Sequence, residues 1–167
     1  MSLLRRRMMP TAVRALIDLP SGDALLAAAA LEDGSYAAAS RFALHRVAGG
    51  EVTSWPWTEV DRAAFDPEAA VVHVTLVTGE TIDLELTAER NRSFAQTLRE
   101  RVQNSVVTAS STQLENGTTV RVAVRRASDG QLFSQVIAVG VLDLSEPTTA
   151  AVVDELESRV RQAAGLP

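Results

Sequence analysis

The fold class of this chain is decided by residues 24–57, ALLAAAALEDGSYAAASRFALHRVAGGEVTSWPW. Two dipeptides in this stretch, Asp33-Gly34 and Gly49-Gly50, are typical of two-residue type I′ hairpin turns, because both of their positions tolerate a positive φ. We therefore expect antiparallel strands before, between and after these turns. The alanine-rich start could form a helix by propensity, but the pairing that the first turn implies favours a strand.

Pairing residues about the two turns predicts which side chains share a face. About Asp33-Gly34, the pairs are Leu31 with Tyr36, Ala29 with Ala38 and Leu25 with Phe42. About Gly49-Gly50, they are Val47 with Val52, Leu44 with Trp55 and Phe42 with Trp57. Both hairpins then select one apolar layer, and a one-residue slip would turn its side chains outward. The predicted layer contains Leu25, Tyr36, Phe42, Leu44, Trp55 and Trp57. Pro56 falls on the other face, as suits an edge strand.

The next segment continues the strand pattern and then changes period. Residues 58–66 and 71–77 read as strands joined by a turn at Asp66-Pro67-Glu68, and a hairpin around Gly79 follows. The inward side chains of this region are expected to be Val72, Val74, Leu76, Ile82, Leu84 and Leu86. From Thr87, a plausible N-cap with Glu89 in the first turn, the apolar residues recur every four positions, which predicts a helix of about four turns. Its buried stripe is Phe94, Leu98 and Val102, and its arginines are interpreted as a solvated face.

The remainder repeats this plan on a smaller scale. Strands are expected at 105–115, 118–127 and 131–139, with turns at Asn116-Gly117 and Asp129-Gly130. A C-terminal helix should be capped by Ser145, carry Pro147 in its first turn and end at Gly165. Its predicted buried stripe is Val152, Val153, Leu156 and Val160.

These elements predict an α+β fold that is mainly antiparallel β. A barrel or meander capped by a helix is followed by a three-stranded antiparallel unit and a C-terminal helix. In order and length, residues 24–106 resemble the pleckstrin-homology superfold. The first hairpin loop, Glu32-Asp33-Gly34, is acidic, so it does not match the basic loop that binds phosphoinositides in that family. We expect one domain over residues 1–167, with a subdivision into 20–105 and 106–167 left open.

At a finer level the chain resembles a family of uncharacterised proteins of similar length from high-GC Gram-positive (actinobacterial) bacteria. The residues that carry this resemblance are Pro56-Trp57-x-x-Val60-x-x-Ala63-x-Phe65-Asp66-x-Glu68, Leu98-Arg99-Glu100-Arg101-Val102-x-x-Ser105-Val106-Val107 and Arg125-Arg126. It covers most of the chain beyond about residue 24. The resemblance supports the fold and implies no activity.

Composition excludes several chemistries. The chain has no cysteine, which removes disulfides, thiolate catalysis and Cys-rich zinc sites, and all 16 basic residues are arginine, which removes Schiff-base and P-loop lysines. A net charge of −5 argues against a nucleic-acid partner. No apolar run reaches the length of a membrane span, and Arg14, Asp18 and Asp23 interrupt any signal-peptide core. We expect a cytoplasmic protein that needs no cofactor.

The two histidines are the first candidates for chemistry. His73 lies across from Glu85 or its neighbour, with Asp83 on the same face, so a metal site or a general base could be built there. Two histidines without a fixed short spacing are not a ligand signature, however. We interpret His73 as part of an exposed cross-strand pair. His45, which shares an outward face with Arg41, is interpreted in the same way.

The arginines provide the best candidate for a ligand site. Arg121 and Arg125 share one face of a predicted strand, Arg126 is adjacent, and Arg41 and Arg46 lie in another strand. Together they could grip a phosphate or carboxylate. A solvated, salt-bridged sheet face is the alternative interpretation, since 21 acidic residues are available as partners.

Three functions follow from these observations. The first is a non-catalytic protein-interaction or scaffolding module that binds a protein partner or a second copy of itself through a strand edge or helix face. The alternative is a small anionic-ligand-binding domain that uses Arg121, Arg125 and Arg126. A hydrolase that uses His73 with a carboxylate is the third. No catalytic or metal-binding residue is assigned.

Overall fold

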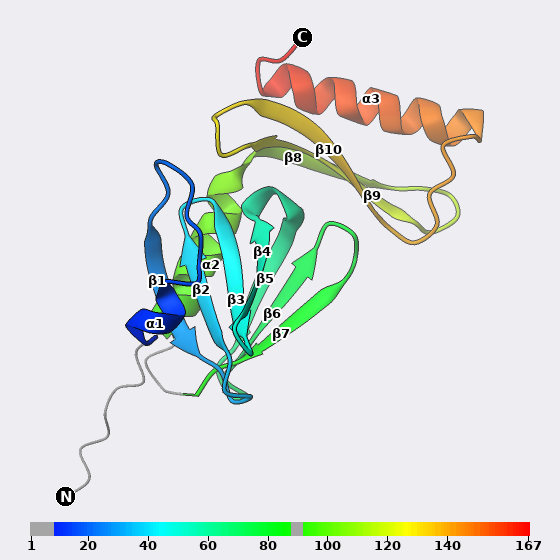
Figure 1. Ribbon diagram of the computed structural model, residues 1–167. Coiled ribbons are helices and arrows are strands. Elements are labelled where there is room, and N and C mark those ends of the chain that lie inside the picture. The colour runs from blue at the N-terminus through cyan, green and yellow to red at the C-terminus, as the bar shows by residue number, and fades with distance from the viewer. Residues whose placement is uncertain (1–8, 88–91) are drawn as a thin grey trace, which may run out of the picture. The chain divides into compact units, whose positions relative to one another are not determined.

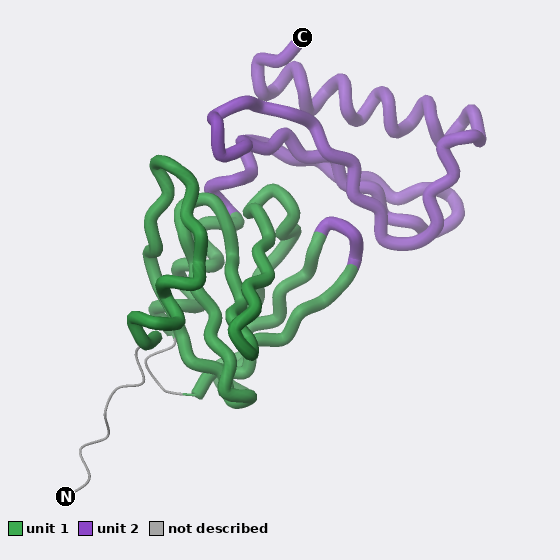
Figure 2. Tube along the Cα trace, in the orientation of Figure 1, with its two compact units in different colours: residues 1–76, 80–102 green, residues 77–79, 103–167 purple. Residues whose placement is uncertain are grey.

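The computed structural model describes residues 9–87 and 92–167 and has the expected α+β class. Within these residues, antiparallel strands form three sheets, ordered β1-β2-β3-β4, β5-β6-β7 and β10-β9-β8 (Figure 1). The chain divides into two compact units, one of residues 1–76 and 80–102 and one of residues 77–79 and 103–167 (Figure 2). The first-turn role predicted for Glu89 and the solvated position predicted for Arg90 of the first long helix lie outside the described residues, as do the N-terminal arginines 5–7.

The first sheet follows a short helix, α1 (Thr11–Arg14), and contains β1 (Leu25–Ala30), β2 (Tyr36–Ser40), β3 (Ala43–Ala48) and β4 (Glu51–Pro56). The alanine-rich segment is a strand, as expected. The turn between β3 and β4 is also as predicted. Gly49 and Gly50 both have positive φ, 58° and 85°. The pairs Val47 with Val52 and Leu44 with Trp55 are therefore confirmed, and Pro56 lies on an edge strand.

The predicted turn between β1 and β2 was wrong by one residue. The loop has three residues, Glu32-Asp33-Gly34, of which only Gly34 has a positive φ, and the pairs are Ala29 with Ala37 and Ala30 with Tyr36. The reason is local: the Asp33 side chain accepts a hydrogen bond from the Ser35 N–H at 2.9 Å, which holds the loop in a three-residue form ending in a left-handed glycine. The same kind of contact recurs in two later turns. Asn116 Oδ1 accepts a hydrogen bond from the Thr118 N–H, and Asp129 Oδ1 accepts one from the Gln131 N–H, each at 2.9 Å.

A turn that the sequence analysis missed lies between β2 and β3. Ser40 ends β2, and its hydroxyl oxygen accepts hydrogen bonds from the backbone N–H of Ala43 at 3.0 Å and of Phe42 at 3.3 Å. Residues 36–47 are therefore a hairpin, with Tyr36 opposite Val47 and Ala39 opposite Leu44, and not one strand. The chain consequently has one strand more before α2 than we expected.

This turn splits the predicted apolar layer between two faces of the first sheet. Leu44 and Trp57 are buried in the main core and Trp55 packs against it, whereas Leu25 packs on a second cluster that contains Ile17, Ala38 and Val47. Tyr36 pairs with Val47 on that second face, and Phe42 lies half-buried in the turn. Small side chains line the paired strands: Ala37, Ala38 and Ala39 have no exposed surface.

The second sheet and the first long helix complete this unit. A short 3₁₀ turn, η1 (Trp57–Glu59), leads into β5 (Val60–Asp66), β6 (Val71–Leu76) and β7 (Thr81–Glu85), and α2 spans Arg92–Ser105. The predicted inward residues of β6 and β7 and the stripe of Phe94, Leu98 and Val102 are confirmed as buried, apart from Ile82, which is partly buried against the core. One apolar cluster draws on both sheets and α2.

The second unit places one helix on one face of a three-stranded sheet. It contains β8 (Val106–Gln113), β9 (Thr119–Arg126), β10 (Leu132–Val139) and α3 (Pro147–Ala163). The predicted stripe of α3 is confirmed at Val153, Leu156 and Val160, which pack with valines of β9. It was wrong at Val152, whose side chain is 36% exposed.

The caps of α3 differ from the prediction at one end. Glu146, not Ser145, is the N-cap, and its carboxylate accepts hydrogen bonds from the backbone N–H of Thr148 and Thr149, which lowers its pKa to about 2. Ser145 donates instead to Asp143. At the other end Gly165 lies just past the helix with φ 75°, as predicted, and the Leu166 N–H bonds to the Arg161 carbonyl in a Schellman arrangement.

We predict that Gly140→Ala destabilises the second unit more than Gly130→Ala. Gly140 has φ 118°, and an added Cβ would lie 2.6 Å from Thr118 Oγ1 and 3.2 Å from Thr118 Cα. Gly130 also has a positive φ, but no atom lies within 4 Å of its Cβ position. Backbone strain alone costs about 1 kcal/mol, so we expect about 1 kcal/mol lost at Gly130 and about 2–3 kcal/mol at Gly140. Urea unfolding measures both, and equal losses would contradict the steric explanation.

Candidate functional site

The three arginines of the predicted anion site do not form one exposed patch. Arg125 has no exposed surface, and its Nη1 donates to Ser105 Oγ at 3.0 Å. Arg121 lies on the same face of β9 but about 13 Å away along the strand, and Arg126, the next residue after Arg125, is exposed on the opposite face. An anion in solution therefore meets Arg126 without Arg125, so this geometry does not favour a shared site.

His73 lies on the same exposed face as Asp83, as predicted, but the expected register was wrong, because Glu85 pairs with Val71. His73 pairs directly with Asp83 across β6 and β7, and its Nδ1 lies 2.7 Å from Asp83 Oδ1. Both side chains are about half exposed, at 50% and 57%. The interpretation as an exposed cross-strand pair is confirmed. Among residues 9–87 and 92–167, no group of three or more His, Cys, Asp or Glu side chains is placed to hold a metal ion.

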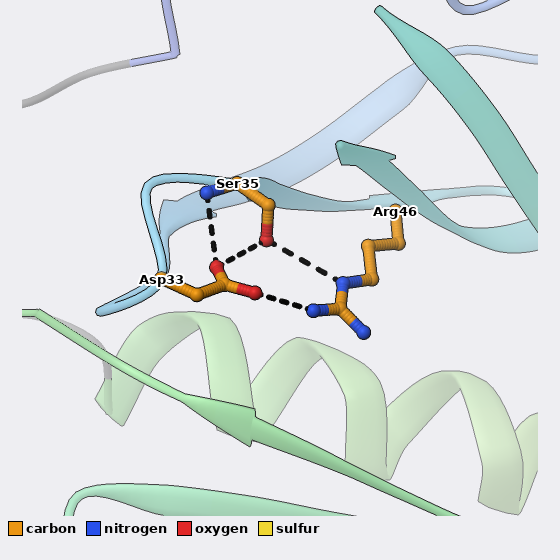
Figure 3. A network of polar contacts seen from close by, with 3 residues as sticks. All are labelled: Asp33, Ser35 and Arg46. Carbon is orange, nitrogen blue, oxygen red and sulfur yellow. Dashed lines mark hydrogen bonds and ion pairs between the residues drawn. The ribbon is translucent and has the colours of Figure 1, made fainter. Parts of the chain in front are cut away.

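Arg46 is engaged in a polar clamp on the first hairpin loop (Figure 3). Its Nη2 donates to Asp33 Oδ2 at 2.5 Å, and its Nε lies 3.4 Å from Ser35 Oγ. Asp33 also accepts hydrogen bonds from the hydroxyl and the N–H of Ser35, and these contacts, followed by Arg46, hold the pKa of Asp33 below its ordinary value. Arg46 thus ties the loop to β3, which accounts for its charge without a ligand.

His45 was expected on an exposed face, and this expectation was wrong. Its side chain is only 4% exposed, because the missed turn at Arg41-Phe42 folds β3 back along β2. The ring bridges two hydroxyl groups: Nδ1 lies 2.7 Å from Ser54 Oγ, and Nε2 lies 3.1 Å from Ser40 Oγ. Ser40 Oγ in turn donates to Asp23 Oδ2 at 2.8 Å. We call Asp23, Ser40, His45 and Ser54 the His45 relay.

The hydrogen bonds of the relay assign the protons on the ring. A hydroxyl has one proton, and the charged carboxylate of Asp23 is the strongest acceptor that Ser40 contacts. The Ser40 oxygen therefore accepts the proton on His45 Nε2, which leaves the Nδ1 lone pair to accept the hydroxyl proton of Ser54. Burial lowers the pKa of His45, and Asp23 opposes this only in part, so the ring is neutral near pH 7.

Part of this relay was open to prediction. The register about Gly49-Gly50 already sets Ser54 opposite His45, and that pair is observed. The contacts of Ser40 and Asp23 were not accessible, because they depend on the turn that ends β2. No spacing rule connects these four residues, which lie before β1, at the end of β2 and within β3 and β4.

The second unit exposes apolar side chains along one edge of its sheet. Val139 is 73% exposed, Val141 76% and Leu144 54%, and Phe133 and Val136 are each 36% exposed. α3 packs mainly against β9 and β8, so β10 receives the least cover. No described strand pairs with the outer side of β10, and Leu132–Val139 contains no charged residue. We call this strand, with Val141 and Leu144, the β10 edge.

Comparison of the chain with protein-family models, curated proteins and solved structures finds no match. In the part of the chain that the structure describes, no helix has the length and apolar character needed to cross a membrane. The basis for assigning a function is therefore the chemistry of two places, the His45 relay in the first unit and the β10 edge in the second.

We predict that the protein loses stability as the pH falls from 8 to 5.5, and that His45 causes much of this loss. The pKa of His45 is below 6.5 in the folded chain, so below about pH 6.5 the unfolded chain takes up a proton that the native state resists. The loss has a maximum slope of about 1.4 kcal/mol per pH unit. Melting temperatures of His45→Gln should vary less with pH than those of wild type. Parallel curves for wild type and His45→Gln would contradict this.

Proposed function

We propose that this chain is a protein-interaction module that acts through the β10 edge, and that its partner there is a second copy of the chain. The observation that carries the proposal is an eight-residue uncharged strand at a sheet edge, followed by exposed Val139, Val141 and Leu144. An edge strand presents a row of unpaired N–H and C=O groups, and natural proteins usually protect such edges with charges, proline or covering elements. β10 contains no charged residue and no proline, and α3 covers it less than it covers β8 or β9.

The sequence of β10 is compatible with pairing to itself. An antiparallel arrangement with a two-fold axis normal to the sheet pairs residues of the same face. Centred on Val136, it sets Val136 against its copy, Phe133 against Val139 and Ser134 against Ala138. Apolar cross-strand pairs of this kind stabilise sheets, and no like charges oppose each other. Two three-stranded sheets would join into one of six strands, with both α3 helices on the same face.

We also infer that the first unit is a variant of the pleckstrin-homology-like fold. Its strands form a meander that is followed by α2, and both sheets share one core with that helix. A single bridge between Leu31 and Leu86 connects the end of β1 to the residue after β7, where a barrel of this kind would close. The loop that binds phosphoinositides in that family is clamped here around Asp33, so protein contacts are the favoured role.

The competing functions receive less support from the geometry. An anion site needs its arginines on one exposed surface, but Arg125 is buried and Arg126 lies on the other face. A hydrolase built on His73 needs a partly dry site, but both His73 and Asp83 are about half exposed. A cytoplasmic location in a high-GC Gram-positive bacterium, with no bound cofactor, remains part of the proposal and rests on composition and on the resemblance above.

We predict that Val139→Lys weakens self-association at least tenfold, since it sets a charge opposite Phe133 in an apolar strand pair. Sedimentation velocity over a wide concentration range measures the monomer–dimer equilibrium. The matched control is Val107→Lys, which changes a 39% exposed valine on β8, the opposite edge of the same sheet, and should leave the equilibrium unchanged. A wild-type chain that stays monomeric at every concentration, or a Val107→Lys variant that alone dissociates, would count against the β10 edge.

A further inference from the structure

We propose that Ser54 is a nucleophile activated by His45, able to accept an acyl group from a small neutral ester. This activity goes beyond protein interaction and uses a different unit of the chain. A serine within hydrogen-bond distance of a base, with the base oriented by a third group, is the arrangement that activates a hydroxyl. This arrangement is present here, because His45 Nδ1 lies 2.7 Å from Ser54 Oγ and His45 Nε2 lies 3.1 Å from Ser40 Oγ.

The exposure of the two residues suits these roles. Ser54 is exposed on β4, an edge strand of the first sheet, so an electrophile can approach its Oγ from solvent. His45 lies beneath it and is 4% exposed, so the base is held in one orientation away from bulk water. Burial also keeps the ring neutral near pH 7, which is the form that accepts a proton.

The backbone of Ser54 adds a donor beside its hydroxyl. In a two-residue hairpin the residues that flank the turn, Ala48 and Glu51, form a hydrogen-bonded pair, and such pairs then alternate with non-hydrogen-bonded ones. By this alternation His45 and Ser54 form a non-hydrogen-bonded pair. The Trp57 N–H to Phe42 carbonyl bond, at 3.2 Å, agrees with the alternation. The Ser54 N–H therefore points to the outer side of β4, where no described strand pairs, and it can donate to an oxygen that becomes negative.

The reaction can be written with these groups alone. Ser54 Oγ forms a bond to the ester carbonyl carbon while its proton passes to His45 Nδ1. The tetrahedral intermediate collapses, the ester C–O bond breaks, and His45 returns the proton to the departing alkoxide as an alcohol. A water oxygen then bonds to the acyl carbon while its proton passes to His45 Nδ1. The bond between the acyl carbon and Ser54 Oγ breaks, and His45 returns the proton to Ser54 Oγ, which restores the serine and releases a carboxylic acid. Asp23, acting through Ser40, stabilises the ring while it is charged.

The surroundings of Ser54 indicate the class of ester. Side chains that share its face of β3 and β4 are uncharged and apolar on both strands, as the observed pairing requires: Ala43, Val47, Val52 and Pro56. No arginine belongs to this set, so nothing there would recognise a phosphate or carboxylate group. A neutral ester of a small alcohol fits this setting.

A fluorophosphonate probe tests the proposal on the full chain, because it forms an Oγ–P bond only with an activated serine and releases fluoride. Mass spectrometry should locate the label on Ser54, and Ser54→Ala should remove it. The rate of labelling should rise with pH as His45 loses its proton. His45→Gln should lower the rate at least tenfold and remove this pH dependence. The matched control is Ser110→Ala, which changes an exposed serine on the edge strand β8 and should alter nothing.

Two results would overturn the proposal. One is labelling of Ser54 no faster than that of Ser110. The other is an unchanged rate and pH profile in a folded His45→Gln variant, as checked by circular dichroism. If that variant unfolds, Asp23→Asn gives the second test, since Asp23 is only half-buried. It should keep the fold and slow the labelling severalfold, and an unchanged rate there would also reject the relay.

Discussion

Ser40 is the residue on which the first unit depends. It has no exposed surface, and its hydroxyl group accepts the Ala43 N–H, contacts His45 Nε2 and donates to Asp23. Its backbone carbonyl accepts the indole N–H of Trp57 at 3.0 Å. One small side chain thus ends β2, turns the chain into β3 and fixes the ring that Ser54 contacts, while its carbonyl anchors the largest aromatic group of the core. The fold of this sheet and the chemistry of its buried histidine have a common origin.

The parts of the fold that could be predicted are those where the hydrophobic period and the turn residues agree. The turn at Gly49-Gly50, the inward side chains of β6 and the stripe of α2 from Phe94 to Val102 are examples, because each is set by short-range pattern alone. The wrong parts are those where a polar side chain bonds to nearby backbone. Asp33 lengthened one turn, Ser40 created another and Glu146 took the cap expected of Ser145. These bonds depend on side-chain geometry that no periodicity contains.

The candidate sites divide in the same way. Alternation along β6 and β7 sufficed to set His73 and Asp83 on one exposed face, but the register that makes them direct partners was not predicted. The arginine site was reasonable by residue type. However, alternation along β9 sets Arg125 and Arg126 on opposite faces, and Arg125 is buried out of reach of solvent. The His45 relay was missed because two of its three contacts, His45–Ser40 and Ser40–Asp23, join segments whose proximity depends on how β2 ends. The chemistry of each residue type could be read from the sequence, but which distant segments lie side by side could not.

The paired strands of small residues have a consequence for how this protein can evolve. Ala37, Ala38 and Ala39 are fully enclosed, with Ala29 and Ala30 beside them, and a close-packed interior has no room for added methyl groups at such positions. A run of alanines resembles compositional drift in a GC-rich genome, yet only glycine, alanine or serine would fit there. Lineages that share this fold should therefore diverge in their loops and helix surfaces while this plain, low-information stretch changes least.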